Sequence, residues 1–248
     1  MIFYLGTHVV NWLWAKEDRI PFFVSDTTLR KYKNLKPAKF IWALDSGGYS
    51  ELHKHGKWTI CPHEYAARVD RYATEIGKLQ FAAIQDWMCE ESVRKKTGKS
   101  IKYHQDKTIE SFLLLTRIAP HLPWLPVLQG QSLEDYLNHY QMYRNIGYTG
   151  NLFGLGSVCR RASSAEIVEL VIILHSLGLE IHGFGVKTTA LDKIANNLAT
   201  ADSMAWSYAA RYSPPHTKLC TTHKNCANCY FYAKYWYRKQ IRRIVNCT

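Results

Sequence analysis

The chain has 248 residues, of which 47% are hydrophobic and 21% charged, and its formal net charge is +12 with a pI near 9.3. This composition is ordinary for a globular protein with a sizeable core, and no apolar run reaches the roughly eighteen residues that a membrane-spanning helix needs. The first six residues lack the basic segment and long apolar run of a secretory signal, so we expect no export.

Eight short apolar segments that end in small or polar residues are predicted to be strands. They cover residues 2–5, 21–24, 40–44, 79–84, 125–128, 152–155, 180–186 and 199–202. Segments with apolar spacing near 3.6 residues lie between most of them and are predicted to be helices. These cover residues 62–76, 108–118, 133–146 and 164–177. Because strands and helices alternate, and eight strands fit this length, we expect an α/β fold of the (β/α)8 TIM-barrel type.

Carboxylates, amides and glycines follow the predicted strands, at the barrel end where such enzymes place their active sites. Asp45 ends the third strand, Asp86 follows the fourth and Asp202 ends the eighth. Amides and glycines at the same rim are Gln85, Gln129, Gln131, Gly154 and Gly156. Asp45 and the glutamines have structural alternatives, because Asp45 can simply cap a turn and a glutamine can be a satisfied amide at a strand end.

Three aspartates at one rim allow three kinds of chemistry. They can hold a divalent cation, hydrolyse a glycoside, or displace a base at a sugar carbon. The neighbouring amides offer paired donors and acceptors, as reading the edge of a purine requires, and the Gly154–Gly156 backbone can present an N–H to a carbonyl oxygen.

These residues carry a resemblance to a known family. Asp45-Ser46-Gly47-Gly48-Tyr49 resembles the DSGGF motif of the tRNA-guanine transglycosylases, which are (β/α)8 barrels. The match is closer to their DNA-acting relatives, the 7-deazaguanine DNA-modification transglycosylases of the DpdA type. The matching segments are residues 43–48, 85–90, 104–105, 127–130, 154–161, 182–187 and 201–207.

The resemblance implies a role for the residues at the matching positions. Asp202 resembles the nucleophile that attacks C1′ and releases guanine, and Asp45 the general acid/base. Asp86 resembles the carboxylate that accepts hydrogen bonds from the Watson–Crick edge of the base, and Gln129 and the backbone at Gly156 resemble the donors to its O6.

Further candidates for substrate binding come from the same segments. They are Ser46, Gly47, Gly154, His182 and Lys187. His182 and Lys187 fit the DNA-acting branch better than the tRNA enzymes, but the resemblance gives them no role. His8 and Asn11 are candidates for the pocket wall, with core-facing or capping roles as the alternative.

The basic excess favours a nucleic-acid partner. Arg160 and Arg161, just past the sixth strand, are the first candidates for phosphate contacts. Lys95 and Lys96, in a loop-like stretch at residues 94–102, come next. Each cluster taken singly also fits a solvated face. Because an enzyme that cuts a glycosidic bond in a polymer must usually extrude the base, we expect DNA in duplex or locally unpaired form.

Three closely spaced cysteines near the C-terminus predict a metal site. Cys220, Cys226 and Cys229 lie near His223, the first choice for the fourth ligand, and His216, the second. A closed set of four such ligands is typical of structural zinc. The tRNA enzymes also carry a site of three cysteines and one histidine, with a different spacing; the alternative is three reduced cysteines without a metal.

The sequence therefore predicts a catalytic barrel over residues 1–212, with a zinc-binding segment and a closing basic helix over residues 213–248 of the same domain. The resemblance implies a DNA-guanine transglycosylase that inserts a free 7-deazaguanine such as preQ0, inside a bacterium or phage-infected host, and it allows a homodimer. The alternatives are a tRNA-guanine transglycosylase, against which the sequence shows no appended RNA-binding domain, and a non-catalytic nucleic-acid-binding barrel that partners another enzyme.

Overall fold

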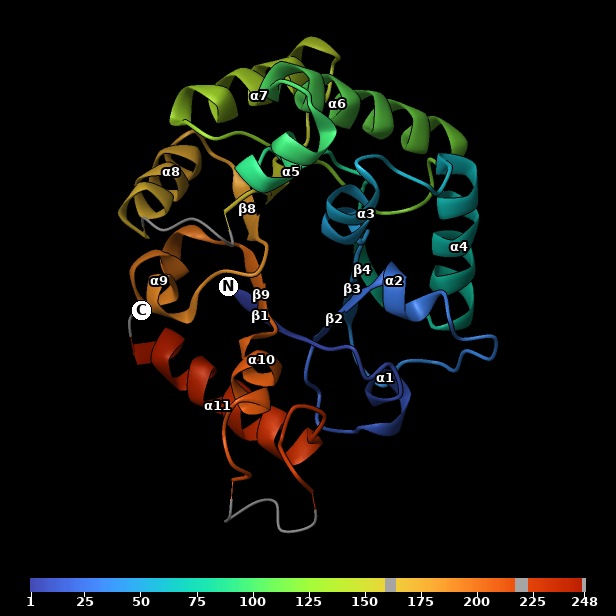
Figure 1. Cartoon of the computed structure of the whole chain (residues 1–248), viewed down its shortest axis with the longest axis vertical. Helices are drawn as coiled ribbons and strands as arrows, with labels where there is room; N and C mark the ends of the chain where they lie inside the picture. The colour runs from blue at the N-terminus through green and yellow to red at the C-terminus, as the bar shows by residue number, and fades with distance from the viewer. Residues whose placement is uncertain (159–163, 217–222, 247–248) are drawn as a thin grey trace.

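A computed structural model describes residues 1–158, 164–216 and 223–246. Within these ranges, nine parallel strands form a nearly closed barrel with helices around it (Figure 1). The strands are β1 (Ile2–Gly6), β2 (Phe22–Ser25), β3 (Trp42–Asp45), β4 (Leu79–Ala83), β5 (Trp124–Leu125), β6 (Val127–Leu128), β7 (Leu152–Leu155), β8 (Glu180–Gly183) and β9 (Thr200–Ser203). Their order around the sheet is β5-β4-β3-β2-β1-β9-β8-β7-β6.

The sequence predicts eight strands, and this count is corrected because Pro126 divides the fifth into β5 and β6. Proline has no N–H for the ladder, so the strand breaks at this residue. The Ile84 N–H donates to Leu125 O at 3.3 Å, and the Gly154 N–H donates to Pro126 O at 2.8 Å. The broken strand thus pairs with β4 through β5 and with β7 through β6, which brings the two ends of the sheet together.

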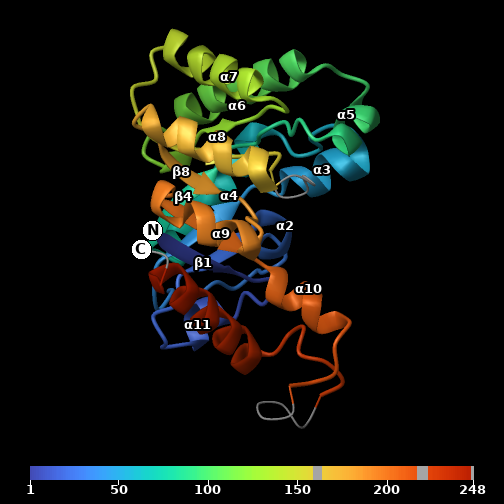
Figure 2. The same cartoon turned by 90° about the vertical axis from the view of Figure 1, so that its left-hand side faces the viewer.

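Helices cover the outside of the barrel (Figures 1 and 2). They are α1 (Trp12–Ala15), α2 (Asp26–Leu29), α3 (Gly48–His55), α4 (Pro62–Glu75), α5 (Glu91–Thr97), α6 (Ile101–Ile118), α7 (Leu133–Asn145), α8 (Ser164–Ser176), α9 (Thr188–Ile194), α10 (Ala205–Arg211) and α11 (Tyr230–Asn246). The structure confirms the helices predicted at residues 62–76, 133–146 and 164–177.

The stretch at residues 94–102 is not a loop, as the sequence suggested, but the end of α5 and the first turn of α6. Gly98 ends α5 in the left-handed conformation, with φ of 66°. The Ser100 side chain then accepts a hydrogen bond from the Tyr103 N–H at 3.2 Å, which caps α6. This cap explains why α6 begins before the predicted helix at residues 108–118.

Alternate residues of each strand point into the barrel and outward to the helices. Phe3 and Leu5 belong to the large outer core, whereas Tyr4 joins an inner cluster with Phe23, Ala43, Phe81 and Leu125. These inner rings fill the barrel below its C-terminal rim. The next inward positions along β2 and β3 are therefore Ser25 and Asp45, above the packed layer.

The last helix, α11, packs on the outside of β1. Its Trp236 and Tyr237 rings lie 6.1 and 6.0 Å from the ring of Phe3, so α11 covers the strand that starts the barrel. Within the described residues, no helix is both long enough and apolar enough to cross a membrane.

Candidate active site

A cavity of about 360 Å³ opens at the C-terminal ends of the strands. Its volume lies in the range of about 300–1,000 Å³ that is usual for small-molecule sites. Phe23 and Phe184 line it beside polar groups from β2, β3 and β9. The barrel thus provides a concave site large enough for a nucleobase above its aromatic layer.

Three carboxylates from different strands line this cavity: Asp45 at the end of β3, Asp86 after β4 and Asp202 in β9. The structure therefore brings Asp45 and Asp202, which are far apart in the sequence, to the same cavity. Carboxylates that share a site repel one another's charge, and this repulsion adds to the effect of burial on Asp45 and Asp86.

Asp45 has a perturbed titration. Burial raises its pKa to about 6; a hydrogen bond from Ser25 opposes the shift, and the charge of Asp202 adds to it. The Gly47 N–H also donates to Asp45 Oδ2 at 3.1 Å. Gly47 adopts φ of 83°, a left-handed conformation that glycine tolerates and that folds the chain back to the carboxylate. A carboxyl with a pKa near 6 is suited to exchange protons at neutral pH.

Asp202 is buried, and a backbone hydrogen bond orients its carboxylate. The Gly185 N–H donates to Asp202 Oδ1 at 2.8 Å, and His182 Nε2 lies 3.6 Å from the same oxygen. His182 Nδ1 is 2.8 Å from Thr200 Oγ1, which fixes the ring. The geometry orients one carboxylate oxygen and places His182 beside it.

Asp86 sits in a polar clamp on the opposite wall. Gln129 Nε2 donates to Asp86 Oδ2, and Ser46 Oγ donates to Asp86 Oδ1 at 3.4 Å. Trp58 Nε1 donates to the Asp86 carbonyl at 3.1 Å. Burial raises the pKa of Asp86 to about 7, and the nearby charge of Asp45 adds to the shift.

Gln129 lies behind Asp86, fully buried, rather than on the cavity wall. Its Oε1 accepts hydrogen bonds from Ser157 Oγ at 2.6 Å and from the Cys89 N–H at 3.3 Å. A side chain at Gly156 would overlap the Gln129 amide, which explains the glycine. The Gly156 N–H donates to Leu128 O at 3.0 Å, so the two donors expected for the base are already engaged inside the protein.

Of the predicted substrate-binding residues, Asp86 and Gly156 line the cavity. Ser46 and Gly47 contact the carboxylates from outside the wall. Gly154 packs against Phe184 below the cavity, and His182 is fully buried beside Asp202. Lys187 is exposed at the start of α9.

The structure describes one of the two pairs of residues that were predicted to contact nucleic acid. Lys95 and Lys96 lie on α5 instead of in a loop, and Lys95 forms an ion pair with Glu91 at 2.7 Å. Arg160 and Arg161 lie outside the described residues. The described part of the chain therefore does not test whether Arg160 and Arg161 contact nucleic acid.

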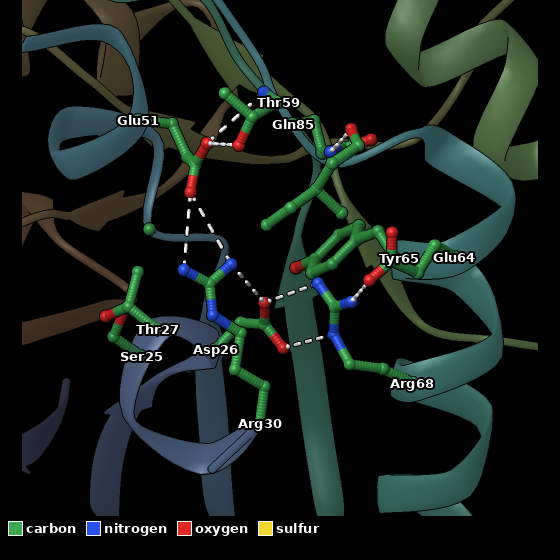
Figure 3. A network of polar contacts seen from close by, with 12 residues as sticks. Ser25, Asp26, Thr27, Arg30, Glu51, Thr59, Glu64, Tyr65, Arg68 and Gln85 are labelled. Atoms are coloured by element: carbon green, nitrogen blue, oxygen red, sulfur yellow. Dashed lines mark hydrogen bonds and ion pairs between the residues drawn. The ribbon is translucent and has the colours of Figure 1, made fainter. Parts of the chain in front are cut away.

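Behind the rim, a buried ionic network ties α2 to α4 (Figure 3). Asp26 at the start of α2 has no exposed surface. Arg68 of α4 donates to its two oxygens at 3.0 and 2.8 Å, and the Tyr72 hydroxyl donates at 2.9 Å. The carboxylate is thus paired and hydrogen-bonded, as a buried charge must be.

Arg30 extends this network to α3, the helix that follows Asp45 and its glycines. Arg30 lies 3.9 Å from Asp26 and 3.3 Å from Glu51. Glu51 in turn accepts hydrogen bonds from the Thr59 N–H at 3.2 Å and the Thr59 hydroxyl at 2.5 Å. The network therefore fixes α3 and the segment after it relative to β2.

Sequence reasoning missed the contribution of β2 to the site. Ser25 and Asp26 follow the second predicted strand directly, as Asp45 follows the third, and that position was the available signal. Ser25, Thr27 and Thr28 line the cavity.

Near the C-terminus, His223, Cys226 and Cys229 form a cluster whose ligand atoms all lie within 4.8 Å of one another. His223 Nε2 is 3.5 Å from Cys226 Sγ, and a tetrahedral zinc site separates its ligand atoms by about 3.4–3.8 Å, so these side chains fit a zinc ion. Cys220 lies outside the described residues. His216 remains nearby, since its backbone N–H donates to Cys226 Sγ at 3.4 Å.

This cluster is joined to the cavity wall. Asn228, between two of the cysteines, bonds through its Oδ1 to His8 Nε2, and His8 lines the cavity. The His8 ring stacks on Trp206 at 6.3 Å, and Ser207 Oγ donates to Ala227 O at 2.8 Å. The fold thus attaches the cysteine segment directly to the rim.

We expect the purified protein to contain about one zinc per chain, and Cys226→Ser to lose it. The reason is that the serine hydroxyl replaces a thiolate ligand in a closed set. Elemental analysis measures the metal, with Cys61→Ser, at an exposed cysteine in a distant part of the barrel, as the matched control. Full zinc in Cys226→Ser, or loss of zinc in Cys61→Ser, would contradict the assignment.

A comparison with protein families matches residues 1–248 to the family described as DpdA, DeoxyPurine in DNA protein A. No curated protein matches the chain.

Proposed function

The chain belongs to the DpdA family of DNA-modification proteins, and from this premise we propose that it is a DNA-guanine transglycosylase. It exchanges guanine in DNA for a free 7-deazaguanine base such as preQ0. The observation that carries the proposal is that Asp45, Asp86 and Asp202 line one cavity of about 360 Å³. In this proposal the barrel is a (β/α)8 catalytic unit over residues 1–212, and residues 213–248 hold a structural zinc.

The first half of the reaction is assigned to Asp202 and Asp45. An Asp202 oxygen attacks C1′ of the extruded nucleotide, the bond from C1′ to the guanine nitrogen breaks, and Asp45 gives its proton to the departing base. The product is an ester between Asp202 and the DNA. The Gly185 N–H bond at 2.8 Å supports this role, because it orients the Asp202 carboxylate.

The second half runs in the reverse sense. The ring nitrogen of the incoming 7-deazaguanine attacks C1′, the ester bond breaks, and Asp45 takes the proton that this nitrogen loses. One proton is therefore returned for each one given, and no ATP is needed. The pKa of about 6 supports this assignment, because Asp45 then holds or releases a proton near neutral pH.

Asp86 is assigned to the N–H groups on the Watson–Crick edge of the base. Gln129 is a positioning residue in this scheme, because it donates to Asp86 and is itself held by Ser157. A carboxylate held in this way presents its free lone pairs to the N–H donors of a guanine-like edge.

This assignment predicts that free base binds more tightly as the pH rises from 5 to 8. Only the ionised Asp86 accepts from two N–H donors, and its pKa is about 7. Below pH 7 the affinity is therefore expected to fall about tenfold per pH unit. Calorimetric titration with preQ0 at several pH values measures this, with Asp86→Asn as the control that removes the slope. Affinity that stays constant or weakens toward pH 8 would contradict the role of Asp86.

The proposed exchange is tested by mass spectrometry of nucleosides from plasmid DNA incubated with the protein and preQ0. We expect the modified deoxynucleoside in DNA and no modified nucleoside in tRNA treated in parallel. Incorporation into tRNA alone would favour a tRNA-guanine transglycosylase, and incorporation into neither would favour a non-catalytic barrel.

A further inference from the structure

The exposed face of α11 carries a groove of about 560 Å³ whose lining combines cations and aromatic rings. It is lined by Phe231, Lys234, Tyr235, Arg238, Lys239 and Arg242. Four of these side chains are basic and none is acidic. We propose, resting on the function proposed above, that this groove binds an unpaired stretch of the DNA strand beside the extruded guanine.

Three of the four cations of the groove, all except Lys234, are available for phosphates. Asp18, the acid beside the groove, pairs with Lys234 and accepts from the Tyr230 hydroxyl at 2.6 Å. Arg238, Lys239 and Arg242 are exposed, and no hydrogen bond or ion pair joins their side chains to the described residues. Arg238 and Arg242 are one turn apart, about 6 Å along the helix, so they present charge along a line.

The aromatic rings favour an unpaired strand over a duplex. Phe231 is 67% exposed and Tyr235 is 47% exposed, one turn apart on the same face. Large rings left in water beside cations are the arrangement on which unstacked bases rest, because every base offers a π-face. In a duplex, the faces of the bases are covered by their neighbours, so the rings would gain little.

The groove starts close to the cavity. Asn228, which bonds to the cavity residue His8, precedes Phe231 by three residues. From Phe231 to Arg242 the helix rises by about 16 Å, down the side of the barrel (Figure 2). A strand that delivers its guanine to the cavity can therefore continue over α11.

Binding of a labelled single-stranded oligodeoxynucleotide, measured as a function of salt, tests the cations. In Arg238→Ala/Lys239→Ala/Arg242→Ala we expect log K to depend less steeply on log salt. The magnitude of the negative slope should decrease by about 2, since each lost phosphate contact removes about 0.7. The matched control is Lys31→Ala/Lys33→Ala/Lys36→Ala, which removes the same charge from exposed positions between α2 and β3. An equal fall in both variants would overturn the groove, because it would show only a general charge effect.

The rings are tested by Phe231→Ala/Tyr235→Ala. We expect single-strand affinity to fall about tenfold or more, with the salt slope and the affinity for a blunt duplex unchanged. Tyr208→Ala/Tyr212→Ala is the control, because it removes two exposed rings, one in α10 and one at the C-cap of that helix. Unchanged single-strand affinity, or sedimentation showing that the rings instead hold a dimer together, would overturn the proposal.

Base exchange at saturating DNA separates this inference from the function on which it rests. Groove variants are expected to bind weakly but to exchange at nearly the normal rate once saturated. If the groove variants bind DNA and exchange the base normally, the groove proposal is rejected and the proposed transglycosylase function stands. If the unaltered protein exchanges no base, but its DNA binding depends on the groove residues, the transglycosylase function is rejected and the groove proposal stands.

Discussion

Asp202→Asn is expected to lower the rate of guanine exchange in DNA by at least about 10⁴-fold, because the amide has almost no nucleophilicity toward C1′. The substitution keeps the size of the side chain, and the asparagine oxygen can still accept from the Gly185 N–H. The fold and the cavity shape are therefore retained while the attacking group is lost. Release of labelled guanine from DNA measures the rate.

The matched control for this variant is Asp106→Asn on the surface of α6, where the carboxylate pairs with Lys102. Its exchange rate should stay within about twofold of normal, since exposed pairs contribute little. Thermal melting checks that both variants are folded. Exchange by Asp202→Asn at a tenth or more of the normal rate would rule out Asp202 as the nucleophile.

Arg68→Met is expected to cost about 3–5 kcal/mol of unfolding free energy, because it leaves the fully buried carboxylate of Asp26 without its bidentate partner. The Tyr72 hydroxyl and the more distant Arg30 cannot replace two charge-assisted hydrogen bonds. Denaturant titration measures the loss. In the double variant Asp26→Asn/Arg68→Met most of it should be recovered, since no unpaired charge is then buried.

Arg71→Met supplies the comparison on the same helix. Arg71 also pairs with a carboxylate, that of Glu75 at 2.8 Å, but these two side chains are 38% and 43% exposed. Its cost should therefore stay within about 1 kcal/mol. Equal costs for Arg68→Met and Arg71→Met would show that burial of Asp26 does not set the energy of this network.

The strand positions were predictable from the sequence because each strand is a short apolar run that ends at polar rim residues. The inner and outer cores explain this, since both faces of β1, β2 and β3 are buried. The break at Pro126 was visible as a proline, but its effect on pairing depends on both neighbouring strands. The helix α5 was missed because its seven residues include three consecutive basic ones, which gave no apolar period.

The convergence of the aspartates followed from the barrel, because strand ends meet at one rim. The placement of Gln129 could not be predicted from the barrel. Its amide is directed to Asp86 by the packing of Ser157 and Cys89 around it. The contact of His8 with Asn228 joins residues 220 positions apart and has no local signal. Sequence patterns thus indicate which groups reach the rim, and packing decides which of them face the cavity.

The attachment of the DNA ester to Asp202 is the central chemical claim, and intact-protein mass spectrometry tests it most directly. The protein is incubated with a single-guanine oligodeoxynucleotide in the absence of free base, quenched with denaturant, and digested to map the adduct. We expect one adduct on the peptide that contains Asp202, and none in Asp202→Asn. An adduct on the peptide that contains Asp45, or one that persists in Asp202→Asn, would contradict it.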